Sequence, residues 1–300
     1  MDLSVGEILH ALRSRRESKR QVSDLLAQPQ NVVVVHYSCE NLYDTTSKRS
    51  PRITSIAIRK FQSGITRSFS IHMYAERKGW LDEISEHYDE LERVMLDEYY
   101  EMVRDCRGYK WVHWNMRDIK FGFPSIDHRY EVLGGTPAVI PDENKVDLSR
   151  MCVAIYGIGY IGHPRLERLV ELNHIGKMEF LPGSKEAELF ASQQYLAVHW
   201  STLRKADMLA NILGRIGDGT LKTTASWWER NGVPLRAIPE MVKEHPIYIG
   251  LGIAAVLLAF VTRLFGVIEL VERLGDPPDA SAVTPAQAPA PSPSVPATLP

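Results

Sequence analysis

A histidine and an aspartate stand five residues apart in this chain, directly after a short apolar run. Trp111 and Val112 form the run, His113 ends it, and Asp118 lies where a helical pattern begins. A carboxylate just past a strand end, at a helix N-terminus, is well placed to hold a metal ion or to meet a phosphate. Asp118 is therefore the first candidate for a catalytic residue.

The surrounding sequence predicts the elements that would position this pair. Residues 31–37 form a continuous apolar run typical of a central strand buried on both faces. Residues 51–61 and 65–72 alternate apolar and polar side chains around a turn at Ser63-Gly64, which predicts an antiparallel meander. A helix over 88–104, a strand over 110–114 and a helix from about Asp118 complete the predicted order. Residues 142–156 predict a loop followed by a helix with Asp147 as its N-cap, and residues 185–213 show a further helical pattern.

With the strand-rich segment before it, the stretch from Trp111 to Phe123 resembles the second motif of the DEDD-type 3′–5′ exonucleases, an RNase H-like family. The resemblance implies four carboxylates that hold two Mg²⁺ or Mn²⁺ ions, which activate a water and stabilise the leaving oxygen. We expect an α/β fold with an RNase H-like mixed sheet, flanking helices and a helical C-terminal half.

The family's motifs match this chain only in part. The first motif, normally Asp-x-Glu at a strand end, corresponds to Ser38-Cys39-Glu40, so that Glu40 matches and Ser38 stands at the aspartate position. In the second motif His113 and Asp118 keep their separation, while Asn115 lies one place late. Arg129 resembles the basic residue that ends this motif in many members.

The last metal ligand of the family lies on a late helix, where this chain offers two substitutes. Tyr195 and His199 keep one family spacing with histidine in place of aspartate, and Glu188 keeps the carboxylate without the spacing. The candidates are Asp118, Glu40, His113 and His199 for catalysis, Glu40, Asp118 and Glu188 for the metal, and Trp200, Arg204 and Lys205 for nucleic-acid contact. The alternative for the last group is the exposed face of a helix.

A glycine motif competes with this interpretation. Gly157-x-Gly159-x-x-Gly162 follows an apolar run, and Glu179 lies about 20 residues further on, as in a dinucleotide-binding fingerprint. The alternative is a glycine-punctuated turn between two helices, because no parallel α/β alternation surrounds the motif.

Composition narrows the class of protein. The 300 residues carry a net charge of −2, which gives no overall signal for a polyanionic partner, and 44% hydrophobic residues suffice for a packed core. Three cysteines at wide spacings argue against a disulfide framework and favour a reducing compartment.

The C-terminal quarter predicts a membrane anchor. Residues 246–262 carry no charge, and with the apolar residues after Arg263 they form a predicted transmembrane helix over 246–268. The other predicted segments are a basic amphipathic helical segment (1–30), the exonuclease-related domain (31–215), a connector (216–245) and a disordered Pro/Ala-rich tail (276–300).

Together these features predict a single-pass membrane protein with its N-terminal domain in the cytoplasm. The first hypothesis is a metal-dependent nuclease that acts on single-stranded nucleic acid. The second is an inactive exonuclease-like sensor or effector, whose span oligomerises or disturbs the membrane. The third is a nucleotide-binding protein that uses Gly157, Gly159 and Gly162.

Overall fold

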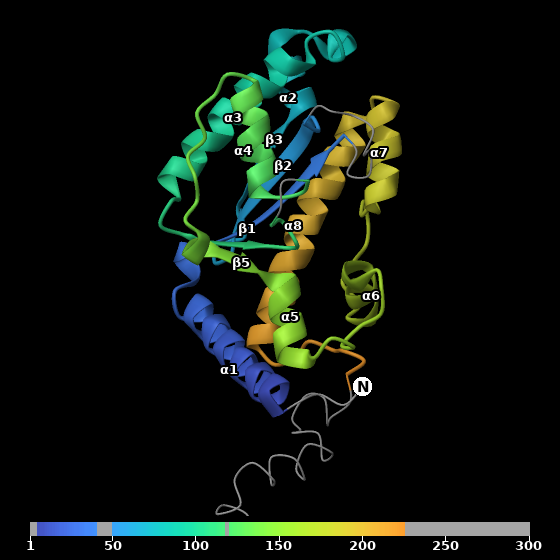
Figure 1. Cartoon of the computed structure of the whole chain (residues 1–300). Helices are drawn as coiled ribbons and strands as arrows, with labels where there is room; N and C mark the ends of the chain where they lie inside the picture. Colours follow the sequence, from blue (N-terminus) through green and yellow to red (C-terminus); the bar gives the residue numbers. More distant parts are fainter. Residues whose placement is uncertain (1–4, 41–49, 118–119, 226–300) are drawn as a thin grey trace, which may run out of the picture. The chain divides into compact units, whose positions relative to one another are not determined.

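A computed structural model of the chain describes residues 5–40, 50–117 and 120–225 (Figure 1). This part of the chain has an α/β architecture, with a five-stranded mixed sheet and eight α-helices. The α/β class expected from the sequence is therefore confirmed. Asp118, the connector beyond residue 225, the proposed span over 246–268 and the tail over 276–300 lie outside the described residues.

The strands follow one another in the order β3-β2-β1-β4-β5. Strand β2 runs antiparallel to its neighbours β1 and β3, while β4 is parallel to both β1 and β5. The predicted antiparallel meander is thus confirmed, and β2 alone runs against the other strands. The strands are β1 (Val32–Cys39), β2 (Ile53–Lys60), β3 (Thr66–Ser70), β4 (Lys110–His113) and β5 (Lys145–Asp147).

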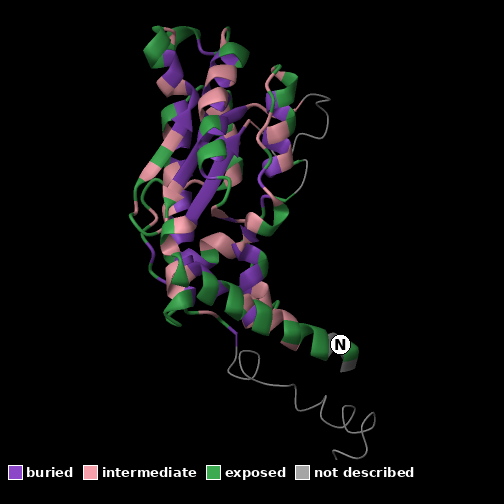
Figure 2. Ribbon diagram, turned by 90° about the vertical axis from the view of Figure 1, so that its left-hand side faces the viewer, coloured by how far each residue is buried: buried purple, intermediate pink, exposed green. Residues whose placement is uncertain are grey.

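Helices cover both faces of the sheet, and two apolar clusters fill the layers between them. One cluster joins the sheet to α3 and α4, and the other joins it to α1, α5, α6 and α8 (Figure 1). Figure 2 shows the strands as a buried layer. The helices are α1 (Val5–Ala27), α2 (Ile71–Lys78), α3 (Tyr88–Asp105), α4 (Phe123–Val132), α5 (Leu148–Tyr156), α6 (Arg165–Leu172), α7 (Gly183–Ala191) and α8 (Tyr195–Gly217).

Strand β1 changes character along one of its faces. Successive side chains of a strand point to opposite faces, and Val32 and Val34 contribute to the cluster beneath α8. Further along the same face come His36 and Ser38, which are also buried. The centre of the fold therefore contains polar groups that need partners.

The helix expected to begin near Asp118 begins at Phe123 instead. Asn115 has a φ of 61°, and Arg117 forms an isolated antiparallel bridge with Gly122. A Cβ atom at Gly122 would lie 2.5 Å from the carbonyl carbon of Met116, so that the chain folds back too tightly there for a helix. The tyrosine hydroxyl of Tyr37 accepts a hydrogen bond from the Gly122 N–H at 2.9 Å and holds this loop against β1.

Two further elements differ from the expectation. We expected a loop where the structure has strand β5. The strand was missed because its three residues are too few to produce a periodic pattern in the sequence. The helical pattern over 185–213 is divided between α7 and α8. The predicted N-cap at Asp147 is confirmed, since its carboxylate accepts the N–H groups of Ser149 and Arg150. No helix within the described residues is both long and apolar enough to cross a membrane.

Candidate functional site

The candidate site is a group of buried polar side chains between the sheet and α8, which we call the buried polar cluster. Helix α8 crosses β1, β2 and β3 and packs against α7 (Figure 1). Its sheet-facing stripe is polar where it meets the ends of β1 and β2. The members of the cluster are His36 and Ser38 of β1, Ser55 of β2, Glu186 of α7, and Ser201, Thr202 and Lys205 of α8.

Three hydroxyl groups connect α8 to the two central strands. The Thr202 hydroxyl donates to the carbonyl of Val198 one turn earlier, at 2.9 Å. Its single proton is thereby used, so Ser38 and Ser55 must both donate to Thr202 Oγ1, at 2.8 and 2.5 Å. Ser38 is thus hydrogen-bonded to the late helix α8. At this position the resemblance implies an aspartate that would share a metal ion with the other carboxylates.

A buried ion pair joins the same helix to α7. The Lys205 ammonium is 2.7 Å from a carboxylate oxygen of Glu186, and both side chains are less than a tenth exposed. The Ser201 hydroxyl donates to the same carboxylate at 2.6 Å and accepts the N–H of Leu181. These bonds compensate the desolvation of both charges, so Lys205 is a fixed internal cation.

Two groups of β1 respond to this environment. Burial, and then the charge of Lys205, lowers the pKa of His36 well below its usual value, so that its imidazole is neutral at pH 7. Burial and the neighbouring carboxylates, Glu186 first among them, raise the pKa of the Cys39 thiol to about 12. Cys39 is therefore protonated and is a poor nucleophile.

Of the carboxylates proposed as metal ligands, the structure describes Glu40 and Glu188. Asp118 lies outside the described residues, and Glu40 follows β1, where a carboxylate oxygen accepts the N–H of Arg52. Glu188 points outward on α7 and pairs with Lys185 at 2.6 Å, both of them more than half exposed. The buried carboxylate of α7 is Glu186, two residues before Glu188.

His113 is a buried histidine within the fold. It is 2% exposed, its Nδ1 accepts the N–H of Met116, and its ring lies edge-on to Phe123. Burial lowers its pKa to about 4, although the carboxylate of Asp147 acts in the opposite direction. A neutral imidazole that already accepts a backbone N–H stabilises the loop after β4.

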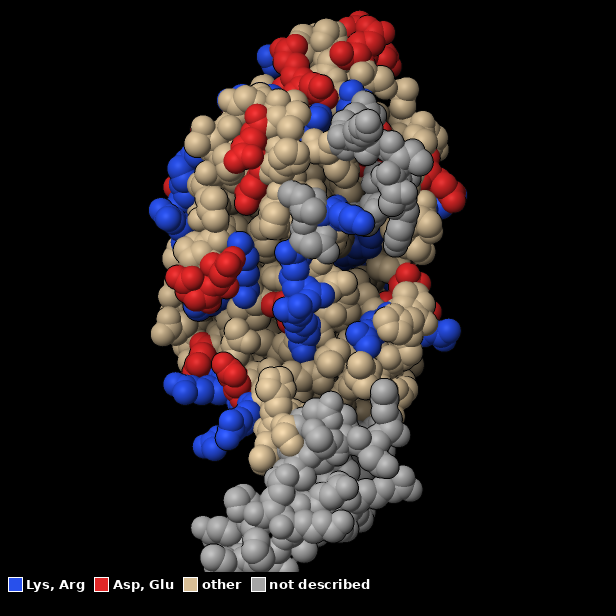
Figure 3. Space-filling view, in the orientation of Figure 1, with Lys and Arg blue, Asp and Glu red and all other residues tan. Residues whose placement is uncertain are grey.

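Basic side chains surround the ends of β4 and β5. Arg117, Lys145 and Arg150 each lower the pKa of His113 through their charge, and Arg117 pairs with Asp147 at 2.7 Å. Figure 3 shows Lys and Arg side chains near the middle of the face drawn in Figure 1. This edge of the sheet is therefore electropositive, and the N-cap Asp147 is its internal counter-charge.

The three residues proposed for nucleic-acid contact have different environments. Trp200 is 46% exposed and remains available for stacking. The Arg204 guanidinium donates twice to the Gly176 carbonyl and pairs with Asp207, and Lys205 is the buried cation described above. His199, proposed for catalysis, faces His72 instead of the hydroxyl groups.

Among the described residues, no three His, Cys, Asp or Glu side chains lie close enough together to hold a metal ion. The cluster offers hydroxyl groups, one paired carboxylate and one ammonium, whereas magnesium and manganese prefer several carboxylate oxygens. Its donor set does not fit the ion pair that the resemblance implies.

The glycine motif lies in a turn. A dinucleotide fingerprint requires a strand before its first glycine, but α5 precedes Gly157, which has a φ of 92° and ends that helix. Residues 158–164 then lead to α6 without forming a strand. The geometry thus matches the glycine-punctuated turn between two helices.

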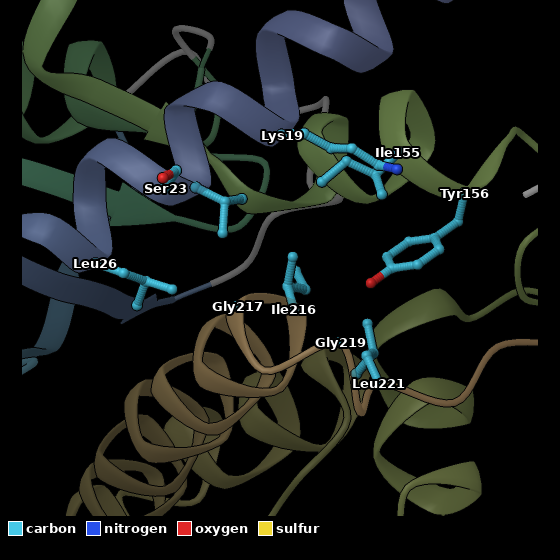
Figure 4. Close-up of a pocket in the computed structure, with 10 residues that line it drawn as sticks. Lys19, Ser23, Leu26, Ile155, Tyr156, Ile216, Gly217, Gly219 and Leu221 are labelled. Atoms are coloured by element: carbon cyan, nitrogen blue, oxygen red, sulfur yellow. The ribbon is translucent and has the colours of Figure 1, made fainter. Parts of the chain in front are cut away.

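A separate cavity of about 500 Å³ lies between α1, α5 and the end of α8 (Figure 4). Its walls combine apolar side chains with the Lys19 ammonium and the hydroxyl groups of Ser23 and Tyr156. It shares no residue with the buried polar cluster and contains no carboxylate, imidazole or thiol. Its lining residues include Val22, Leu26, Ile155, Ile216 and Leu221.

Comparisons of the chain with protein-family models, with curated proteins and with solved structures found no match.

Sequence reasoning missed Ser55, Thr202 and Glu186 as members of one cluster. Ser55 is opposite Ser38 in the β1–β2 register, and Thr202 is seven residues after Tyr195 on α8. The alternation of the strands was visible in the sequence, but the position of α8 over them was not. Glu186 lies two residues before the candidate Glu188, and only the orientation of α7 separates the buried carboxylate from the exposed one.

We predict that Thr202→Val lowers the free energy of unfolding by about 2–4 kcal/mol, because Ser38 and Ser55 lose their common acceptor. Denaturant unfolding measures this change. The triple variant Ser38→Ala, Ser55→Ala, Thr202→Val should recover a large part of it, since no buried hydroxyl then lacks a partner. Thr66→Val on β3 is the matched control, and an equal loss there would contradict the assigned role of Thr202.

Proposed function

We propose that this protein is a catalytically inactive exonuclease-like sensor or effector, which binds single-stranded nucleic acid without hydrolysing it. The strand order β3-β2-β1-β4-β5, with β2 alone reversed, supports an RNase H-like fold, because this is the arrangement expected for such a core. The late helix also approaches the end of β1, as the resemblance requires.

The buried polar cluster is the observation that carries the proposal. Ser38 stands at the position of the family's first aspartate, and its hydroxyl donates to Thr202 of the late helix at 2.8 Å. The Lys205 ammonium already supplies a fixed positive charge nearby, which its effect on His36 makes evident. A divalent cation would be repelled by this charge, and the remaining carboxylate, Glu186, is neutralised by it.

The electropositive edge of the sheet supports a polyanionic ligand. Arg117, Lys145 and Arg150 all lie near His113 at the end of β4. Cations of this kind contact a phosphate backbone without reading its sequence. Trp200 offers an exposed aromatic ring on which a base can stack.

The apolar stretch over 246–268 supports a membrane anchor as part of the same proposal. In this arrangement the nucleic-acid-binding domain lies on the cytoplasmic side, and ligand binding is transmitted to the span. Release of the full-length chain from membranes by alkaline carbonate would contradict the anchor.

The test of the proposed function is incubation of the full-length chain with end-labelled single-stranded DNA and RNA, in Mg²⁺ or Mn²⁺. We expect retarded migration of the strands without shortening. The variant Arg117→Gln, Arg150→Gln should bind more weakly and with a shallower dependence on salt, because two phosphate-facing charges are removed. Arg168→Gln, on α6, is a matched control outside this group of charges.

Metal-dependent shortening that Asp118→Ala abolishes would overturn the inactive assignment and favour the nuclease hypothesis. Strands that migrate unchanged at every protein concentration would overturn nucleic acid as the ligand. Shortening that persists in both Asp118→Ala and Glu40→Ala would indicate a contaminating nuclease, and the assay would then be judged on binding alone.

A further inference from the structure

Two histidines meet at the edge of the sheet, outside the buried polar cluster. His72 is the second residue of α2, and His199 lies in the second turn of α8, which packs against α2 and β3. Their ring centroids are 5.1 Å apart and the ring planes are inclined by 49°. No part of the proposed function uses this pair.

His199 carries polar atoms that the protein leaves without partners. Its side chain is only 7% exposed, and neither ring nitrogen has a hydrogen-bond partner among the described residues. A neutral imidazole has one donor and one acceptor. Leaving a buried polar group unsatisfied costs about 1–3 kcal/mol, and such a group calls for an ion, a water or a ligand.

His72 is oriented by a hydrogen bond that leaves one nitrogen available. The Ser70 hydroxyl donates to the carbonyl of Thr54, at 3.4 Å, and its oxygen lies 2.8 Å from His72 Nδ1. In the tautomer with the proton on Nδ1, His72 donates this hydrogen bond to Ser70. The lone pair of Nε2 is then free, which is the arrangement usual for a metal-binding histidine.

The spacing of the two rings suits metal binding. A tetrahedral ion bonded to one nitrogen of each ring puts two imidazole centroids roughly 5 Å apart. The centroids of His72 and His199 are separated by 5.1 Å.

We propose that His72 and His199 form a binding site for a divalent transition-metal ion that prefers imidazole, such as Zn²⁺. His72 is only partly buried, so the ion can enter from its side and complete its coordination with water. Among the described residues no third His, Cys, Asp or Glu joins the pair, so the ion is exchangeable. This site differs in chemistry from a carboxylate site for magnesium.

The test uses the metal-free full-length chain and Co²⁺ as a spectroscopic probe, with Zn²⁺ as the competitor. We expect one equivalent of Co²⁺ to give tetrahedral visible absorption that Zn²⁺ removes. His72→Gln and His199→Gln should each weaken binding at least tenfold. His128→Gln, which changes an exposed histidine of α4, should bind as the original chain does.

A second readout keeps the proposal testable if His199→Gln fails to fold. Zn²⁺ should raise the thermal midpoint of the original chain and of His128→Gln, because an ion that binds only the folded state stabilises it. His72→Gln should fold and lose this rise. An equal rise in His72→Gln, or Co²⁺ binding that neither variant weakens, would overturn the site and show that the two rings only pack together.

Discussion

Arg129→Met is expected to lower the free energy of unfolding by about 3–5 kcal/mol, because it leaves the Glu92 carboxylate buried without its cation. Glu92 is 0% and Arg129 4% exposed, and two guanidinium nitrogens reach the same carboxylate oxygen, at 3.0 and 2.6 Å. Burial raises the pKa of Glu92 to about 7, while Arg129 and the Ile53 N–H oppose the rise. Equilibrium unfolding in urea at pH 8 measures the loss.

The same pair positions the site. The other Glu92 oxygen accepts the N–H of Ile53 at 2.6 Å, and Ile53 is paired with Cys39 where the β1–β2 register shifts. We therefore expect Arg129→Met also to loosen the end of β1. Faster amide exchange at Ile53 would report this directly.

Arg77→Met is the matched control for the loss of an arginine. Arg77 pairs with Glu98 at the surface, where its side chain is 57% exposed, so its removal should cost less than about 1 kcal/mol. The double variant Arg129→Met, Glu92→Met should recover much of the loss, since both buried charges disappear. If Arg129→Met costs no more than Arg77→Met, the buried pair does not stabilise the fold as argued.

The second large effect is loss of stability as the pH falls from about 6.5 to 4. His113 and His199 both have a folded-state pKa of about 4, against an ordinary value of 6.5. In this window the unfolded chain takes up protons that the folded chain does not, so unfolding becomes more favourable. The difference corresponds to about 3 kcal/mol for each histidine.

Glu92 acts in the opposite direction over nearly the same range. Its folded-state pKa of about 7 lies above the ordinary value of 4.5, so the folded chain gains stability as the pH falls from 7 to 4.5. The measured dependence of stability on pH is the sum of these contributions, and variants are needed to separate them. His199→Gln should lose less stability than the original chain between pH 7 and 4, whereas His128→Gln should follow the original chain.

Urea midpoints measured at intervals between pH 7 and 4 give this comparison. Parallel curves for the original chain and His199→Gln would contradict a neutral, buried His199. The measurement is made without divalent metal, because an ion on the proposed histidine pair would itself compete with protons.

The buried polar cluster fills the space between β1 and α8. In an active nuclease the space between the first strand and the late helix must admit metal ions and a reacting phosphate. Here hydroxyl groups join α8 to β1 and β2, and an internal ion pair joins α8 to α7. We therefore propose that the ligand binds over the electropositive edge of the sheet, while the cluster holds the helix in place.

The sequence by itself determined most of the elements, because their signals are local. Alternation predicted β2 and β3, an apolar run predicted β1, and helical spacing predicted α3. Asp147 was recognisable as an N-cap because its partners lie two and three residues further along the chain. The five-residue spacing between His113 and Asp118 made His113 a candidate for catalysis, whereas in the structure His113 is a buried ring.

The tertiary structure alone decided which of these residues meet. Ser38 and Thr202 are 164 positions apart, and the hydrogen bond between them depends on how α8 lies across the sheet. The rotation of α7 about its axis decides that Glu186 is buried against Lys205 while Glu188 is exposed. His72 and His199 meet because α2 and α8 lie together at one edge of the sheet. Periodicity describes which face of an element is buried, but the partner on that face comes from distant parts of the chain.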